Sequence, residues 1–207
     1  MELHSAIYSR RSIRKFLPDP ISDEQIRQIV AAGMQAPSGC NSQCWQFVAL
    51  RRPENIREVA RQVEEAVRDF YDGEEERFVR QRIVQTTFFK NAPLVFFIFC
   101  TKMEYHDSRV TEYYLKKGCS PEEMLRALGE PDLLSVGAAV ENMLLQIHQM
   151  GLGGCWMNDP LVARDAICRT LDMPPDSRLV SVLPVGKPAY QPRCKPMKGM
   201  DEVLILR

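Results

Sequence analysis

The longest strongly apolar run of the chain, APLVFFIFC at residues 92–100, sets the first constraint on the fold. A helix that crosses a bilayer needs about 20 consecutive apolar residues, and this run is about half that long. Its Val, Ile and Phe residues are typical of strands. The run therefore predicts a buried strand.

The bulk composition is ordinary for a soluble globular protein. With 207 residues, of which 45% are hydrophobic and 26% charged, the chain is long enough for one domain with a sizeable core. We therefore expect a single domain over residues 1–207. Lys and Arg total 27, as do Asp and Glu, so no overall charge attracts nucleic acid or an acidic membrane.

The N-terminal residues and the cysteine pattern both favour a protein of the reducing cytoplasm. The first residues lack the uninterrupted apolar segment of a secretory signal, and we expect a cytoplasmic protein. Of the seven cysteines, only Cys40 and Cys44 form a C-x3-C pair, with no second pair and no nearby histidine. Zinc needs four converging ligands, so reduced thiols are the better interpretation.

Hydrophobic spacing and turn signals divide the chain into helices and strands. Residues 22–35 read as a helix that Ser22 and Gln25 begin with a capping box and that Pro37 ends. The other expected elements are a strand at 44–51, one long or two short helices at 53–90, helices at 133–150 and 160–171, and strands at 179–186 and 202–206. This irregular order, without repeated β-α-β units, indicates an α+β fold.

The segment 103–131 is the least regular part of the chain, and the residues leave two interpretations open. It is either a lid or an irregular excursion from the fold. We therefore treat residues 53–130 as a variable helical and lid region within the single domain.

A cluster of positive charge precedes the first clear helix. Arg10, Arg11, Arg14 and Lys15 surround Ser12 in the sequence SRRSIRKF. Arginine presents a planar fork of donors that matches a phosphate, and a serine hydroxyl adds one more donor. The ordinary alternative is a solvated basic patch whose arginine stems cover the core, and on these residues alone that alternative is favoured.

The sequence APSGCNSQCWQF, at residues 36–47, combines a tight turn with amide side chains. The turn exposes backbone donors, and Asn41 and Gln43 each offer a donor and an acceptor that suit the edge of a heterocycle or a sugar hydroxyl. A polar turn held by its own side chains explains the same residues equally well.

Motifs for a nucleophile, a phosphate loop or a metal are not recognisable in the sequence. GLGGCW at 151–156 follows a helix instead of opening one, so a helix stop is its simpler explanation. His4, His106 and His148 lie far apart and outside any such motif. If the protein is an enzyme, a bound cofactor is expected to carry the chemistry.

Together and in this order, the motifs resemble the FMN-dependent nitroreductase family. The resemblance rests on SRRSIRKF, on APSGCNSQCWQF about 25 residues later, on LSVGAAVENMLLQIHQMGLGGCWM, and on the ending PVGKPAY and KPMKGMDEV. It spans almost the whole chain, although residues 53–130 contribute little to it. The resemblance implies an α+β fold with a mainly antiparallel central sheet flanked by helices. It also implies an intertwined homodimer with an extended C-terminal arm.

The resemblance further implies contacts to FMN, two copies of which would lie at the dimer interface. The implied contacts are Arg10, Arg11, Ser12 and Arg14 at the phosphate, ribityl chain and pyrimidine edge; Pro37, Ser38, Gly39 and Asn41 from the other subunit; Trp156, Met157 and Asn158 beside N5; and Lys195 and Lys198 at the phosphate.

Three positions depart from the family pattern. Cys44 replaces a turn proline, Met197 occupies a position that is commonly basic, and Asn158 with Asp159 stands where small residues or Glu-Gly often occur. The last departure would change the polarity near N5 and with it the choice of substrate.

The resemblance implies an oxidoreductase that takes hydride from NADH or NADPH onto FMN and then reduces a nitroaromatic, quinone or related acceptor in a ping-pong cycle. No side chain need act as the acid, so no catalytic residue is assigned. The alternatives are a flavin-binding or regulatory protein with little turnover, a dehydrogenase or dehalogenase of the family, and a globular protein without flavin. The expected partners are a second copy of the chain and a small-molecule acceptor, with no nucleic acid, membrane or metal.

Overall fold

The strand predicted from the apolar run lies in the middle of the molecule. The computed structural model describes residues 2–103, 107–174, 177–194 and 196–207. Its four-stranded sheet has the order β1-β2-β4-β3, and each neighbouring pair is antiparallel. The strands are β1 (Trp45–Leu50), β2 (Leu94–Cys100), β3 (Gly153–Gly154) and β4 (Arg178–Gly186).

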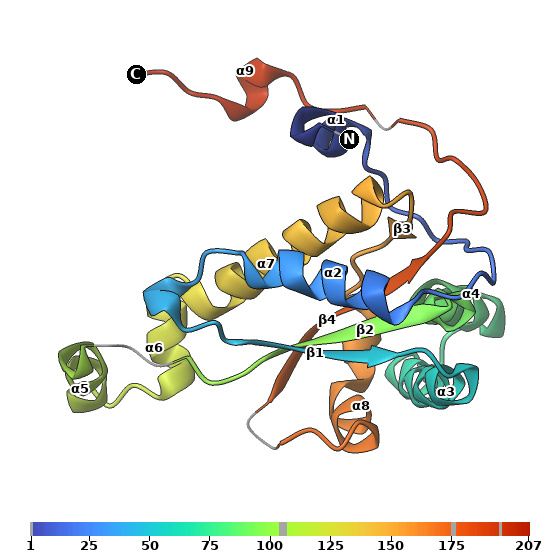
Figure 1. The fold of residues 1–207 in the computed structure, drawn as a ribbon. Helices are drawn as coiled ribbons and strands as arrows, with labels where there is room; N and C mark the ends of the chain where they lie inside the picture. Colours follow the sequence, from blue (N-terminus) through green and yellow to red (C-terminus); the bar gives the residue numbers. More distant parts are fainter. Residues whose placement is uncertain (1, 104–106, 175–176, 195) are drawn as a thin grey trace.

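Every residue of β2 is buried, because helices cover both faces of the sheet. Successive side chains of a strand point to opposite faces. Accordingly, Phe97 and Phe99 belong to one hydrophobic cluster, and Phe96 and Ile98 belong to the other. Figure 1 shows α2 and α7 on one side of the sheet and α3 and α8 on the other.

The helices follow the predicted order closely. The helix expected at 22–35 is α2, and Ser22 and Gln25 form the predicted capping box. The region 53–90 contains two helices rather than one, separated by a turn in which Gly73 has a φ of +85°. The helices are α1 (Leu3–Ser9), α2 (Asp23–Met34), α3 (Pro53–Phe70), α4 (Glu76–Thr87), α5 (Ser108–Lys116), α6 (Pro121–Ala127), α7 (Pro131–Gln149), α8 (Arg164–Thr170) and α9 (Met200–Val203), with short 3-10 helices at η1 (Gly39–Asn41), η2 (Phe88–Asn91) and η3 (Asp159–Ala163).

Two helices occupy the segment that the sequence left least defined. Residues 103–131 contain α5 and α6, which project from one end of the molecule (Figure 1). Among the described residues, no helix is both long and apolar enough to cross a membrane.

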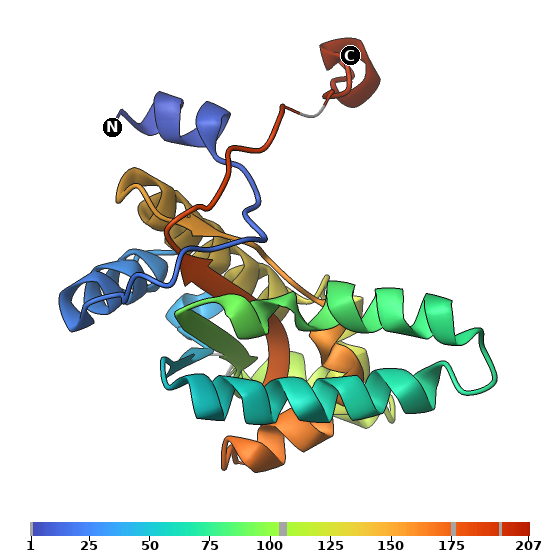
Figure 2. The same cartoon turned by 90° about the vertical axis from the view of Figure 1, so that its right-hand side faces the viewer.

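The prediction of a final strand at residues 202–206 is wrong. The chain forms the short helix α9 at Met200–Val203 and then runs on without regular structure. We call residues 187–207 the C-terminal arm. Figures 1 and 2 show that it leaves the sheet and passes beside α1, away from the strands that could pair with it. Among the described residues, the apolar, β-forming segment 203–206 therefore has no neighbouring strand to pair with.

The basic segment near the N-terminus is fixed against the edge of the sheet. Ile13 N–H donates to the carbonyl of Gly154 over 2.9 Å, and Leu17 N–H donates to the carbonyl of Lys187 over 2.9 Å. A Cβ atom at Gly153 would lie 2.3 Å from Cγ1 of Ile13. The absence of a side chain at Gly153 is thus what allows the segment to lie so close to β3.

We expect Gly153→Ala to lower the free energy of unfolding by about 1–3 kcal/mol, the usual effect of overpacking, because the new methyl group would collide with Ile13. Urea unfolding followed by circular dichroism measures this change. Gly137→Ala is the matched control, since a Cβ there would lie 3.6 Å from Trp156, an ordinary contact. Equal stability of the Gly153 variant and the wild type would show that the segment is not packed this closely.

Candidate functional site

Four arginines surround one pocket of about 430 Å³ beside α1. Three of them, Arg10, Arg11 and Arg14, come from the basic segment that the sequence singled out. The fourth is Arg193, which the C-terminal arm contributes. The remaining lining residues are Ile7, Tyr8, Ser12, Pro192 and Met197. The fold therefore brings the cluster and the arm together, and we call this space the arginine pocket.

Arg10 retains unused donor capacity. Its Nε lies 3.3 Å from Oε1 of Glu141 on α7. Nevertheless, this Nε is buried and finds no hydrogen-bond partner within the described chain. A buried donor without a partner is costly, so the pocket would gain from a bound acceptor.

The Arg11 side chain forms its described hydrogen bonds within the protein. Its Nη1 donates to the carbonyls of Tyr8 and Arg10 over 2.8 and 2.7 Å, and its Nη2 lies 2.7 Å from Sγ of Cys194. The side chain thereby joins the end of α1 to the C-terminal arm. Its charge still contributes to the arginine pocket, although most of its described donors are directed to the backbone and to Cys194.

A second cavity, of about 480 Å³, adjoins the arginine pocket and shares Arg11 and Pro192 with it. His148, at the end of α7, lines this cavity, and its Nε2 lies 2.7 Å from Oγ of Ser9. Burial, together with the charges of Arg10 and Arg11, lowers the pKa of His148 below its ordinary value of 6.5. Burial is the larger cause, and the positive charges of the site act in the same direction.

The glycine-rich segment lies directly beside the basic one, because Ser12 and Gly154 form a parallel β-bridge. Trp156 is 38% exposed, whereas Met157 is buried and pairs with Val182. Asn158 Nδ2 donates to the carbonyl of Val180 over 2.9 Å. Of these predicted contacts, Trp156 is the side chain left available to a ligand, while Met157 and Asn158 are held by β4.

The predicted turn at Pro37, Ser38, Gly39 and Asn41 lies elsewhere in this chain. It follows α2, and Gly39 N–H donates to Oγ of Ser135 on α7 over 3.1 Å. Cys40, Asn41 and Gln43 all have positive φ values, between 45° and 55°. Non-glycine residues adopt this conformation at a cost and often do so at functional sites. A single chain thus keeps the turn apart from the arginine pocket.

Arg193 lines the arginine pocket, whereas the predicted Lys198 does not. Lys198 is exposed on the C-terminal arm and is not among the residues that line the arginine pocket. Lys195 lies outside the described residues. Arg193, His148 and Glu141 are the residues of this region that sequence reasoning missed. Only Arg193 carried a signal, since it belongs to the proline-rich basic stretch that precedes Lys195.

Cys44, which departs from the family pattern, is buried and close to a second thiol. Its Sγ donates to the backbone carbonyl of Asp132 over 3.7 Å. A hydrogen bond with the neighbouring Cys100 thiol lowers the pKa of Cys44, while burial opposes that shift. Among the residues that the structure describes, no group of His, Cys, Asp and Glu side chains is arranged to hold a metal ion.

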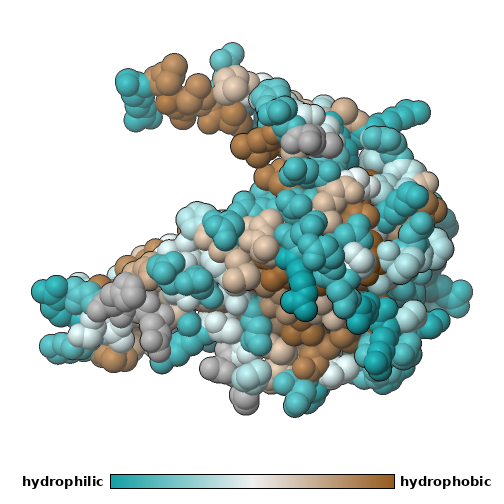
Figure 3. All heavy atoms as spheres, viewed as in Figure 1, coloured by the Kyte–Doolittle hydropathy of each residue, from teal (hydrophilic) through white to brown (hydrophobic). Residues whose placement is uncertain are grey.

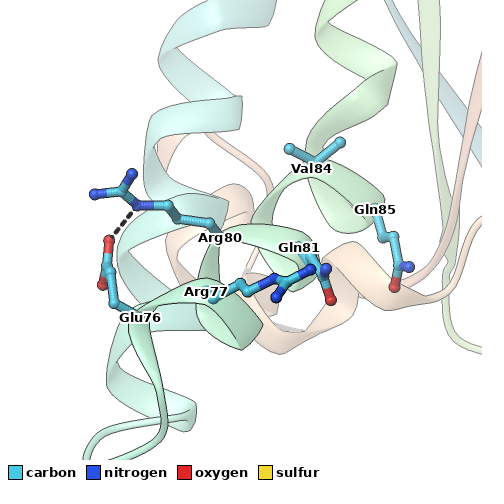
Figure 4. A pocket seen from close by; sticks show the side chains of 6 residues that line it. All are labelled: Glu76, Arg77, Arg80, Gln81, Val84 and Gln85. Carbon is cyan, nitrogen blue, oxygen red and sulfur yellow. Dashed lines mark hydrogen bonds and ion pairs between the residues drawn. The ribbon is translucent and has the colours of Figure 1, made fainter.

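A larger hollow, of about 860 Å³, lies along α4 and is not a candidate site. Figure 4 shows that all six of its lining residues come from this one helix, with Arg80 directed toward Glu76. The Nε of Arg80 donates to that carboxylate over 2.6 Å. The hollow is therefore an open helix surface on which Arg80 and Glu76 pair along the helix.

Comparison with known proteins finds a matching family model and several solved structures with the same fold. The family model described as Nitroreductase family matches residues 7–187. A BluB-like flavoprotein from Clostridium difficile 630 is 28% identical with a TM-score of 0.85, over 100% of this chain and 99% of that one. A nitroreductase with bound FMN from Bacteroides fragilis NCTC 9343 shares the fold at 19% identity and a TM-score of 0.70, covering 100% and 99% of the two chains. The NADPH:FMN oxidoreductase of Vibrio harveyi, complexed with NAD+, shares it at 22% and 0.70, covering 99% and 76%.

We expect the pKa of His148, followed by NMR, to lie below 6.5 and to rise when inorganic phosphate is added, because a bound anion offsets the charges of Arg10 and Arg11. Since the folded-state pKa is lowered, His148 favours the folded state above pH 6.5 and opposes it as the pH falls below that value. Arg10→Ala should raise the pKa toward 6.5 and weaken the response to phosphate. An unchanged pKa in Arg10→Ala would contradict this assignment; Arg80→Ala is the control.

Proposed function

We propose that this chain, which belongs to the nitroreductase family, is an oxidoreductase that binds FMN and uses NADH or NADPH as its electron donor. The observation that carries the proposal is the arginine pocket, which four guanidinium groups line and, among the described residues, no carboxylate does. The likeness to flavoproteins of the same fold supports it.

The residues of the arginine pocket fit the phosphate of FMN. Guanidinium and hydroxyl donors match phosphate oxygens, and Arg10, Arg14 and Ser12 supply both kinds at the wall of the pocket. The buried Nε of Arg10, which lacks a hydrogen-bond partner in the described chain, would gain an acceptor. Arg193, from the C-terminal arm, would add a further guanidinium donor to the phosphate.

When bound, FMN would accept hydride from NADH or NADPH and pass two electrons to a nitroaromatic, quinone or related acceptor in a ping-pong cycle. The chain's own contribution is electrostatic. The positive charges of Arg10, Arg11 and Arg14 favour an anionic ligand beside them. Trp156 is 38% exposed and lies against Gly137 on α7, outside the residues that line the arginine pocket. We assign no catalytic residue.

We further propose that two copies of the chain form the complete site. The end of the C-terminal arm carries apolar residues that are largely exposed in one chain; Leu206, for example, is 84% exposed. Figure 3 shows this apolar end held away from the body across a hollow. A second copy would cover it, and the strained turn at 38–43 would reach the arginine pocket of its partner. The exposed apolar residues of the arm are Met197, Met200, Val203, Leu204, Ile205 and Leu206.

We expect the purified wild-type protein to carry FMN that NADH or NADPH bleaches under anaerobic conditions and that a quinone then restores. We expect Arg10→Ala/Arg14→Ala to bind FMN at least roughly a hundredfold more weakly, since each charge-assisted hydrogen bond contributes about 1.5–3 kcal/mol and solvent lowers the share of exposed Arg14. Absorbance titration measures both effects.

Arg77→Ala/Arg80→Ala is the matched control, because it removes the same two charges from the open surface of α4. Flavin that stays bound in the Arg10/Arg14 variant would refute the placement of the phosphate. Bound flavin that neither nicotinamide bleaches would instead favour a carrier or regulatory protein.

Substitutions confined to the C-terminal arm test whether the chain forms a dimer. We expect Leu204→Asp/Ile205→Asp/Leu206→Asp to shift the protein from dimer to monomer in sedimentation velocity, because burial of each large apolar side chain contributes about 1.5–3 kcal/mol. Val84→Asp, which changes an exposed apolar residue on α4, should leave the dimer intact. A monomeric wild-type protein would rule out the two-chain site.

A further inference from the structure

Two buried thiols, those of Cys44 and Cys100, lie together where β1 begins and β2 ends. Trp45, the first residue of β1, is the Cα partner of Cys100, and Cys44 directly precedes it. Paired residues of an antiparallel sheet are about 4.5–5.5 Å apart and successive residues rise by about 3.4 Å, which puts the two cysteine Cα atoms roughly 6 Å apart. A disulfide bridges Cα atoms that are about 4.4–6.8 Å apart.

The side chains of both cysteines lie in the same layer of the molecule. Alternation along a regular strand would send them to opposite faces of the sheet. Cys44, however, stands outside β1 and follows Gln43, whose φ of +45° redirects the backbone. Both cysteines belong to the hydrophobic cluster on the α7 side of the sheet, and a hydrogen bond joins their thiols. The two sulfur atoms therefore lie next to each other.

Asp132, in the first turn of α7, accepts hydrogen bonds from both thiols. Sγ of Cys44 donates to its backbone carbonyl and Sγ of Cys100 donates to its Oδ2, each over 3.7 Å. Nη2 of Arg178 donates to the same Oδ2 over 2.6 Å. The hydrogen bond between the thiols lowers the pKa of Cys44 and raises that of Cys100. The thiolate is the reactive form of cysteine, so the pair favours Cys44 as the nucleophile.

A cavity of about 660 Å³ under α5 and α6 gives a small oxidant access to the pair (Figure 1). Its lining extends from exposed residues of α5, among them Glu112 and Leu115, to the buried Cys100. The reactive pair is thus buried but lies at the wall of a space much larger than a peroxide molecule.

We propose that Cys44 and Cys100 form a reversible disulfide when a peroxide oxidises them. The thiolate of Cys44 attacks one oxygen of hydrogen peroxide, and the O–O bond breaks. This step leaves a sulfenic acid and a hydroxide, which takes up the proton that Cys44 had released and becomes water. The sulfur of Cys100 then attacks the sulfenic sulfur, the S–O bond breaks, and the hydroxide leaves with the Cys100 proton as a second water. The two thiols lose two electrons and two protons in total, and the peroxide gains them.

The disulfide would remove both sulfur donors from Asp132, beside the turn at 38–43. That turn is tied to the same end of α7, because Gly39 N–H donates to Oγ of Ser135, which donates to the carbonyl of Pro131 over 2.6 Å. The thiol pair therefore borders the two-chain site proposed above, and its oxidation would alter the support of the turn. Formation of the disulfide itself needs no flavin, so its test can succeed or fail separately from that of the flavin function.

The test is peptide mapping of the full-length protein after treatment with hydrogen peroxide, with the remaining thiols blocked and no reductant present. We expect the loss of two of the seven thiols and a disulfide that links the tryptic peptides 28–51 and 91–102. Dithiothreitol should restore both thiols. Cysteines that stay reduced, or that oxidise to sulfinic acids without forming this link, would overturn the proposal.

Three variants identify the sulfur atoms that react. Peptide 28–51 also contains Cys40, so Cys40→Ser should keep the link to peptide 91–102, whereas Cys44→Ser should lose it. A link that persists in Cys44→Ser would assign the bond to Cys40 and overturn the proposal. Cys168→Ser, which changes a half-buried cysteine packed against the other hydrophobic cluster, is the matched control and should keep the link. Circular dichroism checks that each variant folds.

One further variant separates this chemistry from the flavin. Arg10→Ala/Arg14→Ala should form the disulfide with added peroxide as the wild type does, even where it loses FMN. A disulfide that forms only in flavin-loaded protein would be a product of flavin turnover and would overturn the proposal.

Discussion

The burial of β2 on both faces is the constraint from which the rest of the architecture follows. A strand whose seven residues are all buried needs an apolar layer above and below it, and α2 with α7 and α3 with α8 supply these layers. β1 and β4 then occupy the two flanks of β2 and satisfy its backbone hydrogen bonds. The basic segment and the C-terminal arm, which carry the charged chemistry, are left to the edge of the sheet.

At that edge, close backbone packing holds the arginines near one another, although their like charges repel. Gly153 allows Ile13 to approach, and the bridge between Ser12 and Gly154 fixes the arginines that flank it. Four guanidinium groups around one pocket repel each other unless an anion lies between them. Burial lowers the pKa of His148, and the charges of Arg10 and Arg11 lower it further. Anion binding is thus the arrangement that best explains why the chain holds this cluster together.

Arg10 and Arg178, at opposite ends of the molecule, differ in how their guanidinium groups are paired. Arg10 faces Glu141 without forming a hydrogen bond through Nε, so its donor capacity stays largely open. Arg178 is instead held from behind by the buried carboxylate of Asp132. The first arrangement suits a ligand with several negative charges, such as a phosphate. The charge of Arg178 is instead already compensated within the chain.

The sequence by itself determined the elements whose signals are local. The apolar run predicted β2, the capping box at Ser22 and Gln25 predicted the start of α2, and the motif order predicted the family and its α+β fold. The prediction of a final strand at 202–206 was wrong because a strand needs a neighbouring strand, and the C-terminal arm runs away from the sheet. Only the tertiary structure decided that Arg193 joins the arginine pocket, that the turn at 38–43 lies elsewhere, and that Asp132 anchors Arg178. Those pairings join residues far apart in the chain, and their distances depend on packing rather than on spacing along the sequence.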